Sequence, residues 1–130
     1  MRSFLCISAA LIGLMLMVMT PALAHHSIPA FWDESKSIEI NGTVKLLKVV
    51  NPHSELVVEV TAPNGQRESW LGVGGTATGM IKAGWSNETL KVGVPIKVEG
   101  APPRKVGAKG ILIRKITMAD GRVLTTGRID

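Results

Sequence analysis

Cysteine is nearly absent from this 130-residue chain: the only one is Cys6, inside a long apolar run at the N-terminus. A single cysteine cannot form a disulfide within the chain, so the fold depends on backbone pairing and a packed interior. Its position near the start of the run, rather than at the end, argues against acylation as a lipoprotein. After this run, no cysteine is available as a nucleophile.

Other arrangements typical of enzymes are missing as well. No motif combines Ser, His and Asp, and the carboxylates are scattered rather than paired for acid-base catalysis. The segment Gly72-Val73-Gly74-Gly75 resembles a phosphate-binding loop superficially, but no Lys-Ser or Lys-Thr follows it. We therefore do not expect an enzyme.

The one long hydrophobic run, residues 4–19, is typical of a signal peptide. Arg2 precedes it, and Ala22 and Ala24 have the small side chains that signal peptidase requires at its cleavage site. The run is shorter than the roughly 20 apolar residues of a membrane span. We expect residues 1–24 to be a signal peptide, cleaved after Ala24. The chain would then reach the periplasm by the general secretory route and retain no transmembrane span.

The rest of the chain is predicted to form one domain with a short leader. An N-terminal extended segment is expected over residues 25–36, and a single β-barrel domain over residues 37–130. Lys and Arg number 15 and Asp and Glu number 10, so the formal charge is +5. Removal of Arg2 with the signal peptide would leave a formal charge of +4.

Positive charge is concentrated toward the C-terminal end. The predicted surface for an anionic partner consists of five residues: Arg104, Lys105, Lys109, Arg114 and Lys115. A basic surface can attract anionic lipids, glycans or acidic proteins. Nucleic acid is not expected as a partner outside the cytoplasm. The alternative interpretation is a solvated face without a partner.

Alternating apolar and polar residues predict strands over most of the domain. The first strand starts at residue 38 and ends before Asn51-Pro52, and its inward positions are Ile38, Ile40, Val44 and Leu46. The Asn41-Gly42 pair within it predicts a bulge or a kink. Further strands are predicted over residues 55–61, 68–73, 94–99 and 111–118, with a short hairpin return over 123–125.

Residues 76–82, between the third and fourth predicted strands, lack alternation and predict a short helix capped by Thr76. The fold class is therefore mainly β. Five strands with one helix in this place, followed by a C-terminal hairpin, match the oligonucleotide/oligosaccharide-binding (OB-like) barrel. In that architecture the helix plugs one end of the barrel, and Met80, Ile81 and Trp85 are expected to fill the plug.

Four short segments occur in a characteristic order: His25-His26-Ser27, Asn51-Pro52-His53, Gly84-Trp85 and Thr89-Leu90-Lys91-Val92-Gly93. In this order the chain resembles a family of small exported bacterial proteins, the domain of unknown function 6152 family. The resemblance implies a periplasmic location and a barrel-like β domain, but no known activity. Before the fifth strand the family usually has an acidic, glycine-containing loop, whereas this chain has Arg104-Lys105-Val106-Gly107.

Three histidines, His25, His26 and His53, are the candidate metal ligands. After cleavage at Ala24, His25 would offer both its free amine and its imidazole. A third nitrogen from His53 would complete a T-shaped set that suits Cu(II), and Zn(II) is the other candidate. His26 is an alternative ligand or a supporting group. The competing interpretation is that the N-terminal histidines bind nothing and His53 only hydrogen-bonds a turn.

Only five aromatic residues, three Trp and two Phe, are available for stacking against a sugar. Because a small barrel needs most of its aromatic side chains inside, we expect Trp70 and Trp85 to pack in the core. The predicted function is a periplasmic binding or interaction module with a basic face for an anionic partner protein, lipid or glycan. The alternative is a periplasmic copper or zinc protein that uses His25 and His53.

Overall fold

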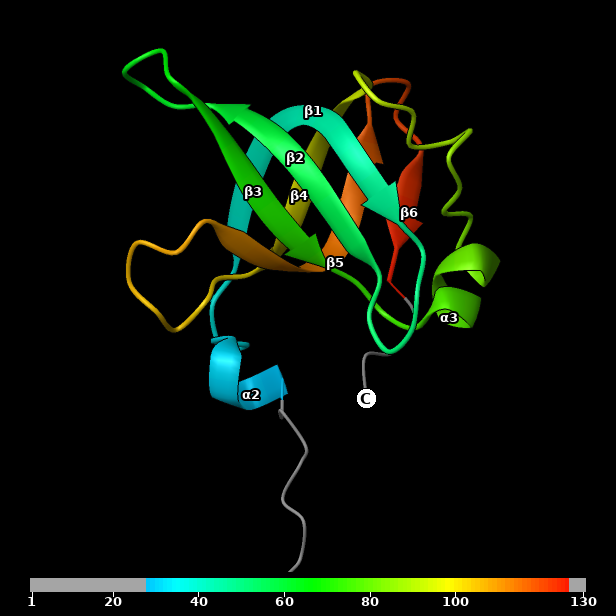
Figure 1. The fold of residues 1–130 in the computed structure, drawn as a ribbon, viewed down its shortest axis with the longest axis horizontal. Helices are drawn as coiled ribbons and strands as arrows, with labels where there is room; N and C mark the ends of the chain where they lie inside the picture. Colours follow the sequence, from blue (N-terminus) through cyan, green and yellow to red (C-terminus); the bar gives the residue numbers. More distant parts are fainter. Residues whose placement is uncertain (1–27, 127–130) are drawn as a thin grey trace, which may run out of the picture.

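Six strands and two short helices make up residues 28–126, the part of the chain that the computed structural model describes (Figure 1). The strands are β1 (Ile38–Lys48), β2 (Glu55–Thr61), β3 (Arg67–Val73), β4 (Pro95–Ala101), β5 (Gly110–Met118) and β6 (Val123–Thr125). The helices are α2 (Ile28–Phe31) and α3 (Ala77–Lys82). The predicted signal peptide lies outside the described residues.

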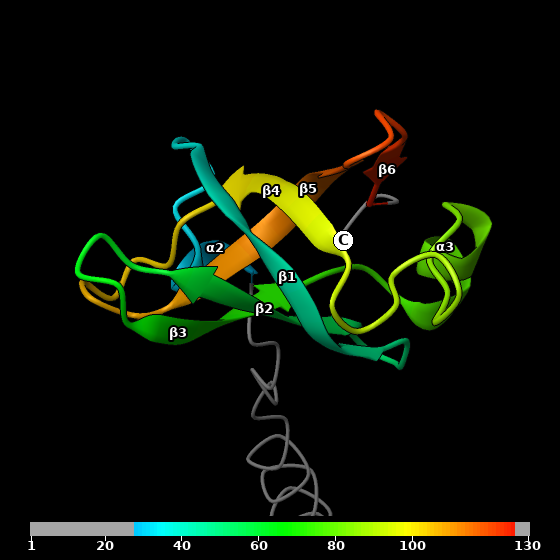
Figure 2. The same cartoon turned by 90° about the horizontal axis from the view of Figure 1, so that it is seen from above.

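The strands close into a barrel through two features of their pairing. The first is that β1 pairs with two neighbours, one after the other along its length. Residues 38–43 of β1 pair antiparallel with β4, and residues 43–48 pair antiparallel with β2. The closing contact is a parallel pairing of residues 71–73 in β3 with residues 110–112 in β5. Figure 2 shows β1 crossing from the β4–β5 side to the β2–β3 side. The predicted OB-like barrel is confirmed, and β6 pairs with β5 outside the five closed strands.

Gly42 lies where β1 changes partner from β4 to β2. A Cβ atom here would collide with the carbonyl oxygen of Glu59 in β2, so glycine allows the two strands to approach closely. The sequence singled out Asn41-Gly42 as a bulge or kink. The break in the pairing register itself lies between Val44 and Leu46.

This bulge reverses the side chains of β1 that face inward. Val44 is buried, but Leu46, predicted to face inward, is 42% exposed, and Leu47 is buried instead. One extra residue in a strand shifts the alternation of its side chains by one position. The prediction for Leu46 was wrong because the alternation was counted across the bulge.

Aliphatic side chains from the strands fill most of the interior. The largest fully buried side chains are Trp85, Leu56, Met80, Leu90, Ile111, Ile113, Ile116, Val44, Val58, Val98 and Ser54. Trp85 is the aromatic member of this set, and its Nε1 donates to the carbonyl oxygen of Thr125 at 3.2 Å. The bond joins the segment after α3 to the end of β6. Core packing of Trp85 is therefore confirmed.

α3 contributes one large side chain, Met80, to the core cluster. Thr76 caps the helix as predicted: its side chain accepts a hydrogen bond from Gly79 N at 3.3 Å. Ile81, which was also expected in the plug, is 63% exposed. Successive helical residues point about 100° apart, so a helix of six residues turns few positions toward the barrel.

The leader before the barrel is partly helical rather than extended. Within the predicted extended segment, residues 25–36, α2 spans Ile28–Phe31, and Trp32 N donates to Ile28 O at 3.0 Å. Pro29 suits a first helical turn, because its fixed φ is helical and no N–H is needed there. Residues 25–27 are outside the described part. Between residues 28 and 126, no helix is long and apolar enough to cross a membrane.

Candidate functional site

Two segments far apart in the sequence meet at one end of the barrel. The first, residues 28–37, is the N-terminal strap. The second, residues 102–109 between β4 and β5, is the basic loop, and it carries three of the five residues predicted to meet an anionic partner. Arg104 N donates to Phe31 O at 2.8 Å, so the basic loop and the strap form one surface (Figure 1).

Two arginines that were predicted to bind an anionic partner also hold the strap. Arg104 Nε donates to Pro29 O at 2.8 Å. Arg114 donates from Nη2 to Glu34 O at 2.6 Å and from Nη1 to Lys36 O at 3.2 Å. Nε of Arg104 and both terminal nitrogens of Arg114 are therefore committed to the strap. Arg114 therefore attaches the strap to β5.

Asp33 organises the strap from within. Its carboxylate accepts a hydrogen bond from Ser35 Oγ at 2.6 Å and pairs with Lys36 Nζ at 3.0 Å. The Arg104 guanidinium lies 4.0 Å from the same carboxylate. These contacts lower the pKa of Asp33 from 3.8 to about 2, and the hydrogen bond from Ser35 is the largest cause.

Lys109 and Lys115 are both engaged in ion pairs. Lys109 Nζ lies 2.9 Å from the carboxylate of Glu68 and 5.6 Å from the centroid of the Trp70 ring. Glu68 also accepts a hydrogen bond from Trp70 Nε1 at 3.3 Å, and the hydrogen bond from Lys109 is the main cause of its lowered pKa. Lys115 pairs with Glu99 at 2.8 Å. Both lysines remain partly exposed, but an anionic partner would have to compete with these acids.

Lys105 differs from the other four predicted residues. It is exposed at the tip of the basic loop, and no ion pair to it forms within residues 28–126. Ala108 N donates to Lys105 O at 3.2 Å, which closes a turn, and Gly107 in this turn has a φ of +79°. Val106, next to Lys105, is 98% exposed. The tip therefore presents one uncommitted cation beside one fully exposed aliphatic side chain.

The outer surface of β1, β2 and β3 is the side on which OB barrels commonly bind their ligands. Leu46, Val57 and Leu71 lie opposite one another across these strands, and Leu46 and Leu71 are each just over 40% exposed. Trp70 has the opposite parity and packs against the core. In the described part of the chain, this face offers a short aliphatic row rather than an aromatic platform for a sugar.

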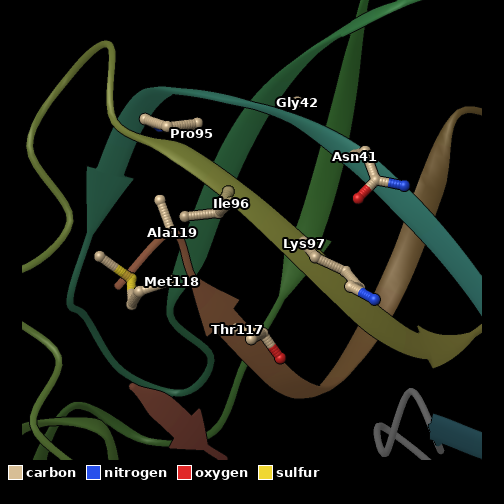
Figure 3. Close-up of a pocket in the computed structure, with 8 residues that line it drawn as sticks. All are labelled: Asn41, Gly42, Pro95, Ile96, Lys97, Thr117, Met118 and Ala119. Carbon is tan, nitrogen blue, oxygen red and sulfur yellow. The ribbon is translucent and has the colours of Figure 1, made fainter. Parts of the chain in front are cut away.

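Two open hollows flank β1 near Gly42. The first has a volume of about 330 Å³ and lies over β1, β4 and β5. Figure 3 shows the side chains of Pro95, Ile96, Met118 and Ala119 on one side of this hollow and those of Asn41, Lys97 and Thr117 on the other. The second hollow, about 380 Å³, is lined by Asn41, Gly42, Thr43, Glu59, Thr61 and Arg67.

The charged groups of both hollows are already paired. Lys97 lies 3.4 Å from Glu39, and Arg67 lies 3.3 Å from Glu59. An open surface of this kind can serve as a contact area.

Of the three candidate metal ligands, only His53 belongs to the described residues; His25 and His26 do not. His53 lies in the loop between β1 and β2, which Ser54 N fixes by donating to Gly75 O at 2.8 Å. The Nδ1 atom of His53 is buried and has no hydrogen-bond partner there. No group of three or more His, Cys, Asp or Glu side chains within residues 28–126 could hold a metal ion. The expectation that His53 hydrogen-bonds a turn is not met at Nδ1.

The strap contacts were not predicted. Every residue has a carbonyl oxygen, so no sequence pattern indicates that Arg104 and Arg114 bind the carbonyl oxygens of three strap residues. These residues are Pro29, Glu34 and Lys36. The valine between Lys105 and Gly107 is visible in the sequence, but its exposure is not, because that depends on the conformation of the turn.

Comparisons with known proteins agree with the resemblance in the sequence. The model of a family of unknown function, DUF6152, matches residues 13–113. No curated protein and no solved structure matches the chain.

Proposed function

The chain belongs to the DUF6152 family, and we propose that it is an exported, periplasmic binding module that meets an anionic partner through its basic loop. The tip of this loop carries the proposal: Lys105 is exposed without an ion pair in the described structure, and Val106 beside it is 98% exposed. Neither side chain has a role in the barrel. A partner that supplies negative charge would give Lys105 the counterion that it lacks.

The position of the loop in the fold supports the same proposal. Leu71 N donates to Lys109 O at 3.1 Å, so the loop borders the aliphatic row on the outer surface of β1, β2 and β3. In OB barrels, the loop between the fourth and fifth strands and this surface commonly contact the ligand together. A partner at the loop therefore has a second contact area next to it.

A soluble polyanion tests the proposal. Isotope-labelled protein that begins at His25 is titrated with polyphosphate while backbone amide signals are followed by NMR. We expect salt-sensitive shifts at residues 104–109. Because one cation near an anionic surface contributes about fivefold in affinity, Lys105→Glu should weaken binding by at least that factor.

Lys91→Glu is the matched control. Lys91 is also exposed, lacks an ion pair in the described part of the chain, and is followed by Val-Gly, as Lys105 is. Its replacement should leave polyphosphate binding nearly unchanged. Equal losses from the two variants, or shifts that avoid the basic loop, would contradict the proposal.

A second candidate function is binding of Cu(II) or Zn(II) in the periplasm. The supporting observation is that His53 Nδ1 makes no hydrogen bond within residues 28–126, so this atom is not committed to a structural contact. The described residues supply one imidazole, and His25 and His26 would have to supply the other nitrogens.

This candidate is tested on protein with a native His25 terminus. A tight one-to-one complex with Cu(II), measured by calorimetry, should disappear in His53→Ala. A residue added before His25 should abolish the complex too, because the free amine is one of the ligands. A complex that tolerates the added residue would rule out the amine ligand.

A further inference from the structure

Resting on the proposed function, we propose that the anionic partner of the basic loop is the surface of a bilayer that contains anionic phospholipids. Val106 enters the boundary between head groups and acyl chains. Arg104, Lys105 and Lys109 remain among the head groups. The chain thus touches the membrane through one loop, without a membrane-spanning segment among residues 28–126.

The first argument is the residue at the tip. The turn is closed by the hydrogen bond from Ala108 N to Lys105 O, with Gly107 supplying the positive φ. Turns favour Gly, Pro, Asn, Asp and Ser, so turn chemistry does not explain a valine at position 106. Its side chain is 98% exposed, and a soluble anion would leave its apolar surface in water. A bilayer boundary removes that surface from water.

The second argument is the arrangement of charge around Val106. Arg104 and Lys109 stand on either side of the tip in the sequence, with side chains 53% and 49% exposed. Long basic side chains can lay their apolar stems along a membrane boundary while the charged groups reach the phosphates. Asp33 and Glu68 offset two of these cations. The attraction is therefore small, and membrane binding should be weak, reversible and sensitive to salt.

A second exposed apolar side chain lies beside the loop. Phe31 is 54% exposed, and its carbonyl oxygen accepts the hydrogen bond from Arg104 N. Figures 1 and 2 show the basic loop extending away from the barrel, with α2 close to where the loop leaves it. The exposed apolar surface at this end of the barrel therefore includes part of Phe31 as well as Val106.

A second turn in the chain has the same tripeptide as the tip of the basic loop and serves as an internal control. Lys91-Val92-Gly93 repeats the tripeptide Lys-Val-Gly, with Val92 75% exposed and Gly93 at a φ of +88°. Gly93 N donates to Val44 O at 2.7 Å, which ties this second turn to β1. Its nearest charged neighbour in the sequence is an acid, Glu88. Val92 thus has similar exposure and turn geometry without the surrounding cations.

The experiment is flotation of the chain beginning at His25 with two kinds of vesicle. One kind contains phosphatidylethanolamine and phosphatidylglycerol, and the other contains phosphatidylcholine alone. We expect flotation with the first kind only. Val106→Asp should abolish it, and Lys105→Glu should reduce the bound fraction by about fivefold or more. Val92→Asp and Lys91→Glu should float as the unchanged protein does.

A loss of binding could also result from damage to the loop, so a variant that is expected to gain membrane binding is tested as well. Val106→Trp should raise the bound fraction and shift its tryptophan emission to shorter wavelength on mixing with phosphatidylglycerol vesicles. Val92→Trp has the same number of tryptophans and should show neither change.

The outcomes separate this inference from the function on which it rests. Polyphosphate binding at the basic loop without vesicle flotation would overturn the membrane inference and leave the proposed function standing. Failure with both probes would overturn both. Flotation that Val106→Asp retains at full strength would also overturn the membrane contact, because charge alone would then explain the binding.

Discussion

Arg104 donates a hydrogen bond from Nε to the carbonyl oxygen of Pro29 at 2.8 Å and so joins two residues 75 positions apart in the sequence. The backbone N–H of the same arginine binds Phe31 O, and Arg114 holds the next part of the strap. The basic loop, which was expected to face a partner, thus also anchors the N-terminal strap. The strap and the basic loop should therefore open together.

Arg114→Ala tests this attachment. The change removes two hydrogen bonds from a charged donor to Glu34 O and Lys36 O, and we expect a loss of about 1 kcal/mol in the free energy of unfolding. For a domain of this size the loss corresponds to roughly 4–8 °C in Tm. Hydrogen exchange at the amides of Asp33 and Arg104 should accelerate more than exchange at the core strands.

Lys91→Ala serves as the control, since it removes an exposed cation that makes no ion pair in the part of the chain described by the structure. It should leave Tm and strap exchange unchanged. If Arg114→Ala behaves like this control, the carbonyl contacts do not hold the strap.

Gly42→Ala tests the crossing of β1 from one partner strand to the other. The added Cβ would meet Glu59 O, which is backbone and cannot move aside, and would lie 2.8 Å from Val58 Cγ1. Overpacking of this kind costs about 1–3 kcal/mol, and we expect the upper part of that range. Urea unfolding followed by circular dichroism measures the loss. A cost below the range would mean that β1 and β2 can separate at this point without penalty.

The arrangement of strands was readable from the sequence because alternation and turn residues are local signals. Pro63-Asn64-Gly65 and Asp120-Gly121 mark hairpins that the structure contains, and Leu56 and Val58 are buried as their parity requires. The prediction for Leu46 was wrong because the alternation of apolar and polar residues does not reveal a bulge. The prediction for Ile81 was wrong because the number of side chains that a short helix buries depends on how the helix packs against the barrel.

The candidate surface was harder to predict than the barrel. Basic residues are visible in a sequence, but their partners are not: Lys109 and Lys115 pair with Glu68 and Glu99, which lie in other strands. Only the fold decides which cation is left with neither an ion pair nor a side-chain hydrogen bond within residues 28–126, and among the five predicted residues it is Lys105. The signal peptide and His25 remain predictions, and mass spectrometry of the exported chain can test the cleavage after Ala24.

The pKa of Asp33 predicts how stability changes in acid. The folded-state pKa, about 2, lies below the ordinary value of 3.8, chiefly because Ser35 donates a hydrogen bond to the carboxylate. A group with a depressed folded pKa adds stability above its unfolded pKa, and this contribution is lost as the pH falls through the folded pKa. The difference in Tm between the unchanged protein and Asp33→Asn should therefore be full above about pH 5 and shrink toward pH 2.

Thermal unfolding at a series of pH values measures this difference. The control is Glu88→Gln, which also removes one negative charge. The Glu88 carboxylate makes no ion pair among residues 28–126, so the difference in Tm for this variant should be smaller at every pH. A difference for Asp33→Asn that grows as the pH falls would reverse the assigned direction of the shift.

His53→Leu tests whether the imidazole has a structural role. Nδ1 of His53 is buried without a partner in the described structure, and an unsatisfied buried polar atom costs about 1–3 kcal/mol. Removing that atom while filling its space should keep the free energy of unfolding or raise it by about 1 kcal/mol. By contrast, Ser54→Ala deletes a fully buried hydroxyl that donates to Val50 O at 3.3 Å, and it should lower stability by about 1 kcal/mol.

Chemical unfolding of the two variants side by side decides the matter. If His53→Leu is as stable as the unchanged protein, any loss of Cu(II) binding in the His53 variants reports on the metal site, because the loop that carries residue 53 is intact. If His53→Leu instead loses more than Ser54→Ala, Nδ1 must have a partner in solution, such as a bound water. The imidazole would then serve the loop between β1 and β2, and the case for a metal ligand at this position would weaken accordingly.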